Sequence, residues 1–199
     1  MTPSPSLPGA RRARRRLARE RAFTLVELMI VVVVIGILAT LAVYGVRRYV
    51  LSAKTAEATQ MIGAIKAGQE AYFDETFRYL DVNGGLDTNR YPVDADWGSK
   101  VQWGGGSGAV AQVRNNFATL GVSSSGAVQF RYSSVAGAPG ASAPSFGVGV
   151  TASEYNFPSS PAVHWYIVKA IADLDEDGVY SVFLGSNFSN EIFSKNPGD

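Results

Sequence analysis

Cysteine is absent from this chain, and only one histidine occurs among its 199 residues. The lack of cysteine excludes a disulfide framework and any metal site built on thiolates. The single histidine, His164, stands in a strand-like run, where an isolated histidine usually packs or faces solvent. The sequence also lacks the Gly-x-Ser-x-Gly motif of serine hydrolases and the P-loop motif of phosphate-binding proteins. These absences predict a protein that is not an enzyme.

Acidic residues are scarce at the amino end of the chain. Residues 1–22 contain seven arginines and one acid, Glu20, whereas the remainder carries 11 basic and 16 acidic side chains. The formal net charge of +1 therefore combines a strongly basic segment with a mildly acidic body. An acidic body argues against nucleic acid as the main partner, and no nucleic-acid partner is expected.

Charge of either sign is missing from the 19 residues Leu28–Val46, which are rich in Val, Ile and Leu. At a rise of ~1.5 Å per residue, a helix of this length nearly crosses a ~30 Å hydrocarbon core. The arginines that precede this segment place the amino end in the cytoplasm by the positive-inside rule. The sequence thus predicts a single membrane span over residues 28–46, with all later residues on the outer side.

Proline is missing from Arg47 to Phe77, so nothing in this segment forces the helix to stop at the membrane. Apolar or small residues recur there at steps of three and four, with charged residues on the other face. The members of this stripe are Ala58, Met61, Ile62, Ile65, Gly68, Tyr72 and Phe73. We therefore expect one helix over residues 23–77, with an apolar front half and an amphipathic back half.

Strand-like runs are confined to the carboxyl-terminal part of the chain. They are Val128–Ser134, Phe146–Thr151, Val163–Ala172 and Gly178–Gly185, separated by turn-forming segments as in an antiparallel sheet. Residues 78–127 are rich in Gly, Asn, Asp and Ser and predict a connecting loop region with a short helix near Ala109–Leu120. The predicted class is α+β, in which a small antiparallel sheet over residues 128–199 packs on the back half of the helix.

A carboxylate stands at the start of the apolar span. Glu27 lies four residues after Phe23 in the stretch Phe-Thr-Leu-Val-Glu, and no other charge in the span is available to pair with it. A charged side chain costs roughly 2.5–3.5 kcal/mol on insertion scales when it is placed centrally in a span, and less near the interface. A carboxylate without a partner in its own span suggests a partner on another chain.

This junction resembles the class III leader of type IV prepilins and type II secretion pseudopilins. In that superfamily a basic leader ends at a small residue and is followed by Phe-Thr-Leu-x-Glu and an apolar span. The resemblance extends over about residues 11–58 and implies that residues 1–22 are a cytoplasmic leader, removed by cleavage between Ala22 and Phe23. It further implies that the same prepilin peptidase N-methylates Phe23. Glu27 is implied to reach the amino terminus of a neighbouring subunit during assembly.

The function implied by this resemblance is structural. The chain would assemble through its apolar helix into a type IV pilus-like filament, either a pilus or a type II secretion pseudopilus. The implied partners are identical or homologous pilin subunits, the prepilin peptidase and an inner-membrane assembly platform. The implied location is a single-pass inner-membrane protein that passes into a periplasmic or extracellular filament.

Three features depart from the usual pattern of the superfamily. Ala22 stands where glycine is usual before the cut, and Tyr44-Gly45 stand where many pilins have proline. The chain also has no cysteine for the disulfide that closes the end of the sheet in many pilins. Alanine is small and compatible with cleavage, and glycine at positions 36 and 45 could supply the helix weakness that proline gives elsewhere.

Two simpler interpretations of the apolar span are a secretory signal peptide and a plain membrane anchor. A signal peptide has an apolar region of about 7–15 residues that ends in an Ala-x-Ala-like site. This span is longer, and Leu38–Ala42 lacks that spacing. A plain anchor gives no reason for Phe-Thr-Leu-Val-Glu beside a basic leader. The alternative function that stays open is a membrane-anchored periplasmic binding module with an uncleaved basic tail.

An acidic segment occurs near the carboxyl end, where residues 173–178 read Asp-Leu-Asp-Glu-Asp-Gly. The first, third and fifth positions of an EF-hand-like calcium loop are held by Asp173, Asp175 and Asp177. The twelfth position is Leu184, where an EF-hand has a bidentate glutamate. A cation would relieve the repulsion among these carboxylates, and the resemblance adds that major pseudopilins often use calcium in their carboxyl-terminal loops. A calcium site and an ordinary hairpin turn at Asp177-Gly178 both stay open.

Overall fold

The computed structural model describes residues 23–93 and 97–197 and divides the chain into two compact units. One unit is Met1–Tyr44, of which residues 23–44 are described, and the other is Gly45–Asp199. The described parts of these units are called the anchor unit and the head unit below.

A single helix, α1 (Leu25–Thr76, 52 residues), forms the anchor unit and supplies the first element of the head unit. It begins after Thr24 and ends where Phe77 adopts a left-handed backbone conformation with φ of 56°. A bulky residue in that conformation is unusual, and it cannot continue a right-handed helix. The helix expected over residues 23–77 is thus observed, shorter by two residues at its start and by one at its end.

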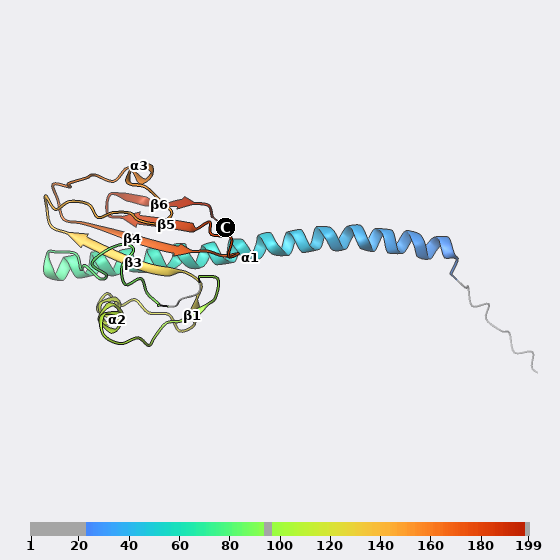
Figure 1. The fold of residues 1–199 in the computed structure, drawn as a ribbon, viewed down its shortest axis with the longest axis horizontal. Helices are drawn as coiled ribbons and strands as arrows, with labels where there is room; N and C mark the ends of the chain where they lie inside the picture. The colour runs from blue at the N-terminus through green and yellow to red at the C-terminus, as the bar shows by residue number, and fades with distance from the viewer. Residues whose placement is uncertain (1–22, 94–96, 198–199) are drawn as a thin grey trace, which may run out of the picture. The chain divides into compact units, whose positions relative to one another are not determined.

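The head unit is built on a four-stranded antiparallel sheet with the strand order β3-β4-β5-β6. The strands are β3 (Arg131–Gly137), β4 (Trp165–Ala172), β5 (Ser181–Ser186) and β6 (Ser189–Lys195). The back half of α1 runs along one face of this sheet (Figure 1). Strands that follow one another in the chain are also neighbours in the sheet, so the topology is a meander. The expected α+β class, a long helix with a small antiparallel sheet, is confirmed.

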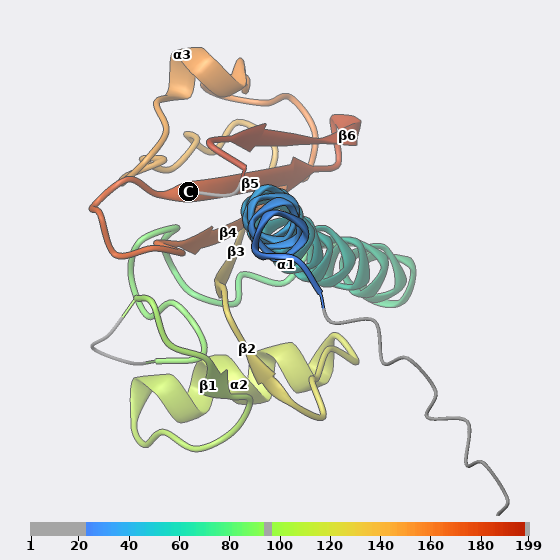
Figure 2. The same cartoon turned by 90° about the vertical axis from the view of Figure 1, so that its right-hand side faces the viewer.

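Smaller elements lie at the two edges of the sheet (Figure 2). On the β3 side are α2 (Ala109–Thr119) and a two-stranded ribbon of β1 (Val101–Gln102) and β2 (Ala127–Val128). On the β6 side is the single-turn helix α3 (Ala152–Tyr155). The short helix expected near Ala109–Leu120 is confirmed by α2.

Alternation along β4 divides the core between the two faces of the sheet. The face toward α1 carries Tyr166, Val168, Ala170 and Ala172. Against it pack Ala58, Ile62 and Ile65 of α1, all fully buried, so the apolar stripe read from the sequence is the surface that the sheet covers. The opposite face carries a second cluster, in which Trp165, Ile167 and Ile171 pack under loop residues such as Leu86 and Phe146. Every residue of β4 is buried, because both faces of this strand are enclosed.

Polar side chains of α1 also form hydrogen bonds with the strands and loops that pack against the helix. The fully buried Gln69 donates hydrogen bonds to the carbonyl of Leu80 (2.8 Å) and to Ser134 Oγ (2.9 Å), and it accepts one from the N–H of Leu80 (2.9 Å). Lys66 Nζ donates to the carbonyl of Ser189 at the start of β6 (2.6 Å). Buried polar groups need such partners because leaving one unsatisfied costs about 1–3 kcal/mol.

The run Phe146–Thr151, which was expected to be a strand, is a loop. Gly147 and Gly149 have φ values of 65° and 88°, which extended strand residues do not adopt. The loop instead surrounds Lys169, a fully buried side chain of β4. Lys169 Nζ donates to the carbonyls on either side of Gly147, at 2.7 and 2.8 Å, and forms an ion pair with Asp87 at 2.7 Å. Burial lowers the pKa of Lys169, and the Asp87 carboxylate opposes that shift.

Strand boundaries differ from the expected ones at both ends of the sheet. The pattern of Ser189–Lys195 does not predict a strand, because none of the residues of this edge strand is buried and only two large apolar residues occur in it. At the other end, β3 starts at Arg131 rather than at Val128, because residues 127–128 pair with β1 instead. β5 starts at Ser181 rather than at Gly178, because the acidic segment before it forms a loop.

Two glycines of α1 are expected to respond oppositely to alanine. Nothing lies within 4 Å of a Cβ added at Gly63, so Gly63→Ala should stabilise the head unit by about 0.5–1 kcal/mol through helix propensity. A Cβ added at Gly68 would collide with the carbonyl oxygen of Leu120, so Gly68→Ala should destabilise it by about 1–3 kcal/mol. Thermal unfolding of the full-length chain in maltoside micelles, followed by circular dichroism, measures both. Equal effects of the two substitutions would contradict this packing of α1.

Candidate functional site

The amino end of α1 is closed by reciprocal hydrogen bonds between Thr24 and Glu27. Glu27 Oε2 accepts from the backbone N–H of Thr24 (2.9 Å) and from its hydroxyl (2.8 Å). In return, the N–H of Glu27 donates to Thr24 Oγ1 (3.2 Å). This is the arrangement of a capping box, which satisfies N–H groups that the first turn of a helix leaves free. The helix N-terminus also favours a negative charge, so the chain itself holds the carboxylate in place.

One part of the sequence interpretation needs correction, since Glu27 does have a partner within its own chain. That partner is the uncharged Thr24, and the Thr-x-x-Glu spacing just before an apolar run is a signal that predicts it. The bonds use only Oε2 of the carboxylate. Among the residues that the structure describes, Oε1 has no hydrogen-bond partner, which leaves one oxygen for a donor from outside the chain.

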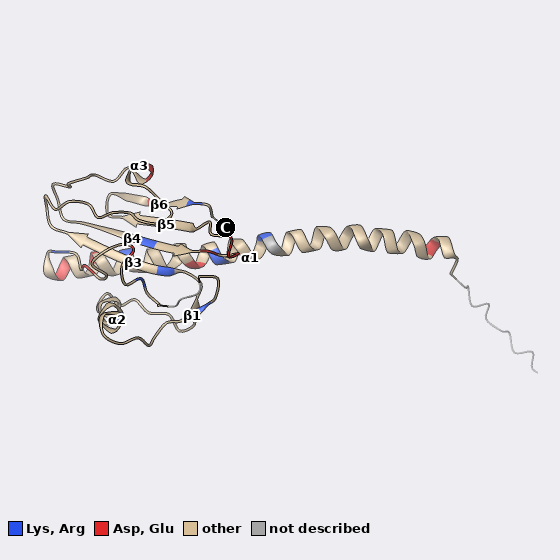
Figure 3. Ribbon diagram, viewed as in Figure 1, with Lys and Arg blue, Asp and Glu red and all other residues tan. Residues whose placement is uncertain are grey.

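The remainder of the anchor unit is an uninterrupted apolar surface. Figure 3 shows one acidic segment near the start of α1, followed by uncharged residues. All side chains of residues 23–44 are exposed, and the hydroxyl of Thr40 is turned back onto the carbonyl of Ile37 (2.7 Å). Within the described ranges, α1 is the one helix long and apolar enough to cross a membrane. Apolar surface on this scale needs lipid or other helices around it.

Of the two residues on either side of the expected cut, the structure describes only Phe23. Ala22 and the arginine-rich leader lie outside the described residues. Phe23 is described, precedes the helix and is 78% exposed. Cleavage between Ala22 and Phe23 and methylation of Phe23 therefore stay predictions.

A second candidate site is the loop of residues 173–180, which connects β4 to β5 in the head unit. Three of its carboxylates offer oxygens that lie within 4.8 Å of one another, those of Asp173, Asp175 and Asp177. The loop turns sharply because Glu176 and Gly178 have left-handed φ values of 63° and 87°. The fold thus brings the three expected aspartates to one point.

The two carboxylate oxygens of Asp173 have different surroundings. Its side chain is only 6% exposed. Oδ2 accepts a hydrogen bond from the N–H of Gly178 (3.0 Å), whereas Oδ1 is buried without a hydrogen-bond partner among the described residues. Leaving a charged oxygen in that state costs about 1–3 kcal/mol or more. A hard cation that prefers carboxylate oxygens would remove this cost, so the donor set fits calcium.

The residues at the ninth and twelfth positions of the EF-hand pattern, Ser181 and Leu184, belong to β5 and make contacts within the head unit instead. The hydroxyl of Ser181, at the start of β5, donates to the carbonyl of Asn196 (2.7 Å), and Leu184 is fully buried in β5. An ion in this loop would therefore complete its coordination with backbone carbonyls and water. Because β4 and β5 pair on either side of the loop, it is also the hairpin connection that the simpler interpretation expects.

His164 has a packing role. Its ring lies edge-on to Phe73 of α1, with 5.9 Å between ring centroids. Its carbonyl accepts a hydrogen bond from the side-chain amide of Asn187 (3.0 Å), at the turn between β5 and β6. These contacts are those of a residue that joins the helix to the sheet.

Two comparisons relate this chain to known proteins. Residues 17–43 match the family described as the prokaryotic N-terminal methylation motif. A segment of 63 residues is 43% identical to a protein of Myxococcus xanthus (strain DK1622) named type IV major pilin protein PilA. That alignment covers 32% of this chain and 29% of the relative, so the chain spans less than a third of the relative's length. No solved structure matches the chain.

The matched residues 17–43 include Phe23, the capping box of Thr24 and Glu27, and most of the apolar span. A basic leader, a small residue, Phe-Thr-Leu-x-Glu and an exposed apolar helix therefore coincide with a known methylation motif. The chain carries a type IV prepilin-like class III leader, and in this respect it is similar to the type IV pilins.

Proposed function

We propose that this chain is a structural subunit of a type IV pilus-like filament, cut between Ala22 and Phe23 and assembled through its amino-terminal helix. The observation that carries this proposal is the capped carboxylate of Glu27 at the start of an exposed apolar helix, inside the matched methylation motif. A plain membrane anchor has no use for a carboxylate there. The relative from Myxococcus xanthus is named a type IV major pilin, which supports the same class of function.

The two oxygens of Glu27 would serve two stages of assembly. An ionised carboxylate in an apolar environment is tolerable only if it is paired and hydrogen-bonded. In the free subunit, Thr24 donates two hydrogen bonds to Oε2. These bonds would lower the cost of keeping the carboxylate in the bilayer before assembly. In the filament, Oε1 would accept the N-terminal ammonium of Phe23 from a neighbouring subunit. Because that contact joins fixed positions on two helices, it would set the stagger between subunits.

The proposed location follows from the leader and the span. Seven arginines before the apolar segment support an orientation with the amino end in the cytoplasm and residues 47–199 on the outer side of the inner membrane. The proposed partners are a prepilin peptidase, an inner-membrane assembly platform and other pilin subunits. The proposal applies equally to a surface pilus and to a type II secretion pseudopilus.

Processing provides the first test of this function. Mass spectrometry of the membrane-extracted protein should show loss of residues 1–22 and an N-methylated phenylalanine at position 23. Ala22→Gly should be processed at least as fast as the natural chain, whereas Ala22→Glu should keep its leader, because the resemblance implies a small residue before the cut. A mature protein that retains its arginines would support the alternative, a membrane-anchored periplasmic binding module with an uncleaved basic tail.

Substitutions in the capping box test the assembly contact. Glu27→Ala should leave cleavage intact and reduce sheared filaments roughly tenfold or more, because a charge-assisted hydrogen bond contributes about 1.5–3 kcal/mol. Thr24→Val keeps the backbone bond to Glu27 and removes the hydroxyl bonds, so an intermediate loss is expected. The amount of filament is measured by immunoblotting after shearing.

The matched control for these substitutions is Glu154→Ala. Glu154 forms the same kind of capping box with Thr151 in α3, within the head unit. Its removal should leave the amount of filament unchanged if the effect belongs to the amino terminus. Normal filaments from Glu27→Ala would exclude the pairing of this carboxylate with a neighbouring amino terminus.

We also propose that the loop between β4 and β5 binds a calcium ion through Asp173, Asp175 and Asp177. The buried Oδ1 of Asp173 favours this site over a bare turn, since the ion would satisfy an oxygen that has no hydrogen-bond partner within the described chain. The loop is also tied to α1, because Lys54 Nζ donates to the carbonyl of Leu174 (3.3 Å). Calcium would therefore fasten the β4–β5 connection to the helix without a disulfide.

Calcium binding is tested by unfolding the full-length chain in maltoside micelles, with calcium and with a chelator. At 100 times the dissociation constant, calcium should add about 2.7 kcal/mol to the free energy of unfolding. Asp175→Ala should abolish this gain, because it removes the oxygen ligands of one of the three carboxylates. The neighbouring Glu176→Gln is the control and should retain it. An unfolding curve that millimolar calcium leaves unchanged would identify the loop as a bare turn.

A further inference from the structure

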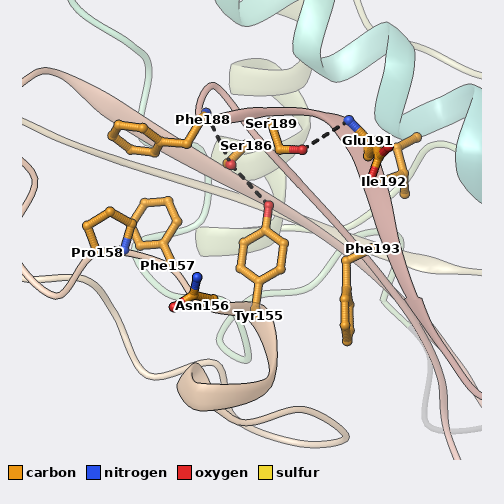
Figure 4. A pocket seen from close by; sticks show the side chains of 10 residues that line it. All are labelled: Tyr155, Asn156, Phe157, Pro158, Ser186, Phe188, Ser189, Glu191, Ile192 and Phe193. Atoms are coloured by element: carbon orange, nitrogen blue, oxygen red, sulfur yellow. Dashed lines mark hydrogen bonds between the residues drawn. The ribbon is translucent and has the colours of Figure 1, made fainter.

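A pocket with a cavity volume of about 330 Å³ opens on the head unit between α3 and the β5–β6 turn (Figure 4). Four aromatic side chains from three segments line it, those of Tyr155, Phe157, Phe188 and Phe193. Glu191 of β6 also lines it. Neither Phe23, Glu27 nor the acidic loop contributes a residue, so the pocket is separate from both sites described above.

Two of the ring pairs meet at steep angles, whereas Tyr155 and Phe157 are nearly parallel, with 6.2 Å between ring centroids and an interplanar angle of 7°. Phe157 and Phe188 are 5.3 Å apart between ring centroids with an interplanar angle of 76°, and Tyr155 and Phe193 are 5.7 Å apart with an angle of 68°. The hydroxyl of Tyr155 donates to the buried Ser186 Oγ (3.0 Å), which fixes the orientation of that ring. Phe188 is 44% exposed and forms the outer wall of the pocket. Aromatic rings of differing orientation, from three segments, therefore line the cavity.

The charge of the pocket is negative. The carboxylate of Glu191 has no ion-pair or hydrogen-bond partner within the described chain. The backbone N–H of the same residue donates to Ser189 Oγ (3.1 Å). The nearby Lys195 does not neutralise it, because its Nζ is paired with Glu154 (2.7 Å). Lys66 reaches the carbonyl of Ser189 from α1 and is not among the residues that line the pocket. None of the described lining residues is basic.

From this geometry we infer that the pocket binds a trimethylammonium group, a compact cation with an apolar surface. The faces of aromatic rings attract cations through the ring quadrupole, and quaternary ammonium groups are recognised by such cages. Glu191 adds a direct charge interaction at the rim. An anionic ligand is disfavoured by the same carboxylate.

The inference is tested with choline as the probe and the full-length chain in micelles of a maltoside detergent. Saturation-transfer NMR and titration should detect the choline methyl groups on the protein. The uncharged isostere of choline, in which carbon replaces the nitrogen, should bind at least about fivefold more weakly, the factor that a unit charge at about 4 Å contributes in water. Equal binding of the two probes would show an apolar crevice and overturn the proposal, as would the absence of choline binding.

Two pairs of variants locate the probe. Glu191→Gln and Phe188→Ala should each weaken choline binding by about two- to fivefold, since each removes one of the attractions described. Their controls are Glu75→Gln and Phe77→Ala, an exposed acid and an exposed ring at the end of α1, which should bind choline like the unmodified chain. Circular dichroism establishes that each variant is folded. Unchanged affinity in both pocket variants would place the choline elsewhere and overturn the assignment.

Discussion

The contact of α1 with one face of the β3–β6 sheet is the constraint on which the rest of the head unit depends. Ala58, Ile62 and Ile65 fill that face, and Gly185 of β5 leaves room for the side chain of Ile62. The contact is also polar at its margin. Glu57 Oε1 of α1 accepts hydrogen bonds from the N–H groups of residues 129 (2.7 Å) and 130 (3.3 Å), just before β3 begins. The helix therefore completes the hydrogen bonding of the chain where the ladder between strands has not started.

The same helix meets two different environments along its length, and its composition changes accordingly. The front half is apolar on all sides, as is required of a helix that lipid or other helices surround. The back half is apolar on one stripe and polar elsewhere, because only one side of it is covered by the sheet. At the start of the front half, Thr24 donates to Glu27 the hydrogen bonds that water would donate to an exposed carboxylate. The cost of a charge in an apolar span is thus reduced before any partner arrives.

Patterns with a strong physical period were predictable from the sequence, and features set by particular contacts were not. The extent of α1, its buried stripe and α2 follow from spacing and from the absence of proline. The loop at Phe146–Thr151 reads as a strand, since nothing in its composition reveals that Lys169 of β4 needs its carbonyls. β6 is missed because an exposed edge strand has no apolar alternation.

The candidate sites show the same division. Phe23 and Glu27 follow from a motif, and the Thr24 contact was readable from the Thr-x-x-Glu spacing. The three aspartates follow from their alternation, which the sharp turn at Glu176 and Gly178 converts into proximity. The buried state of Asp173 is not predictable, because it depends on how the loop lies against the rest of the head unit. The aromatic pocket is lined by residues of α3 and β6, which are about 35 residues apart in the chain. No local sequence pattern predicts that the fold brings them together.

The order of the strands gives the head unit a directional resistance to force. Tension that enters through α1 loads the whole buried cluster and its polar ties together, in shear, so many contacts must fail at once. Tension on the chain after Lys195 acts on β6, which pairs only with β5 among the described strands and which no disulfide secures. The hydrogen bonds between β5 and β6 would then break one after another rather than all together. The fold is therefore strong along the axis of its helix and weak at its last strand.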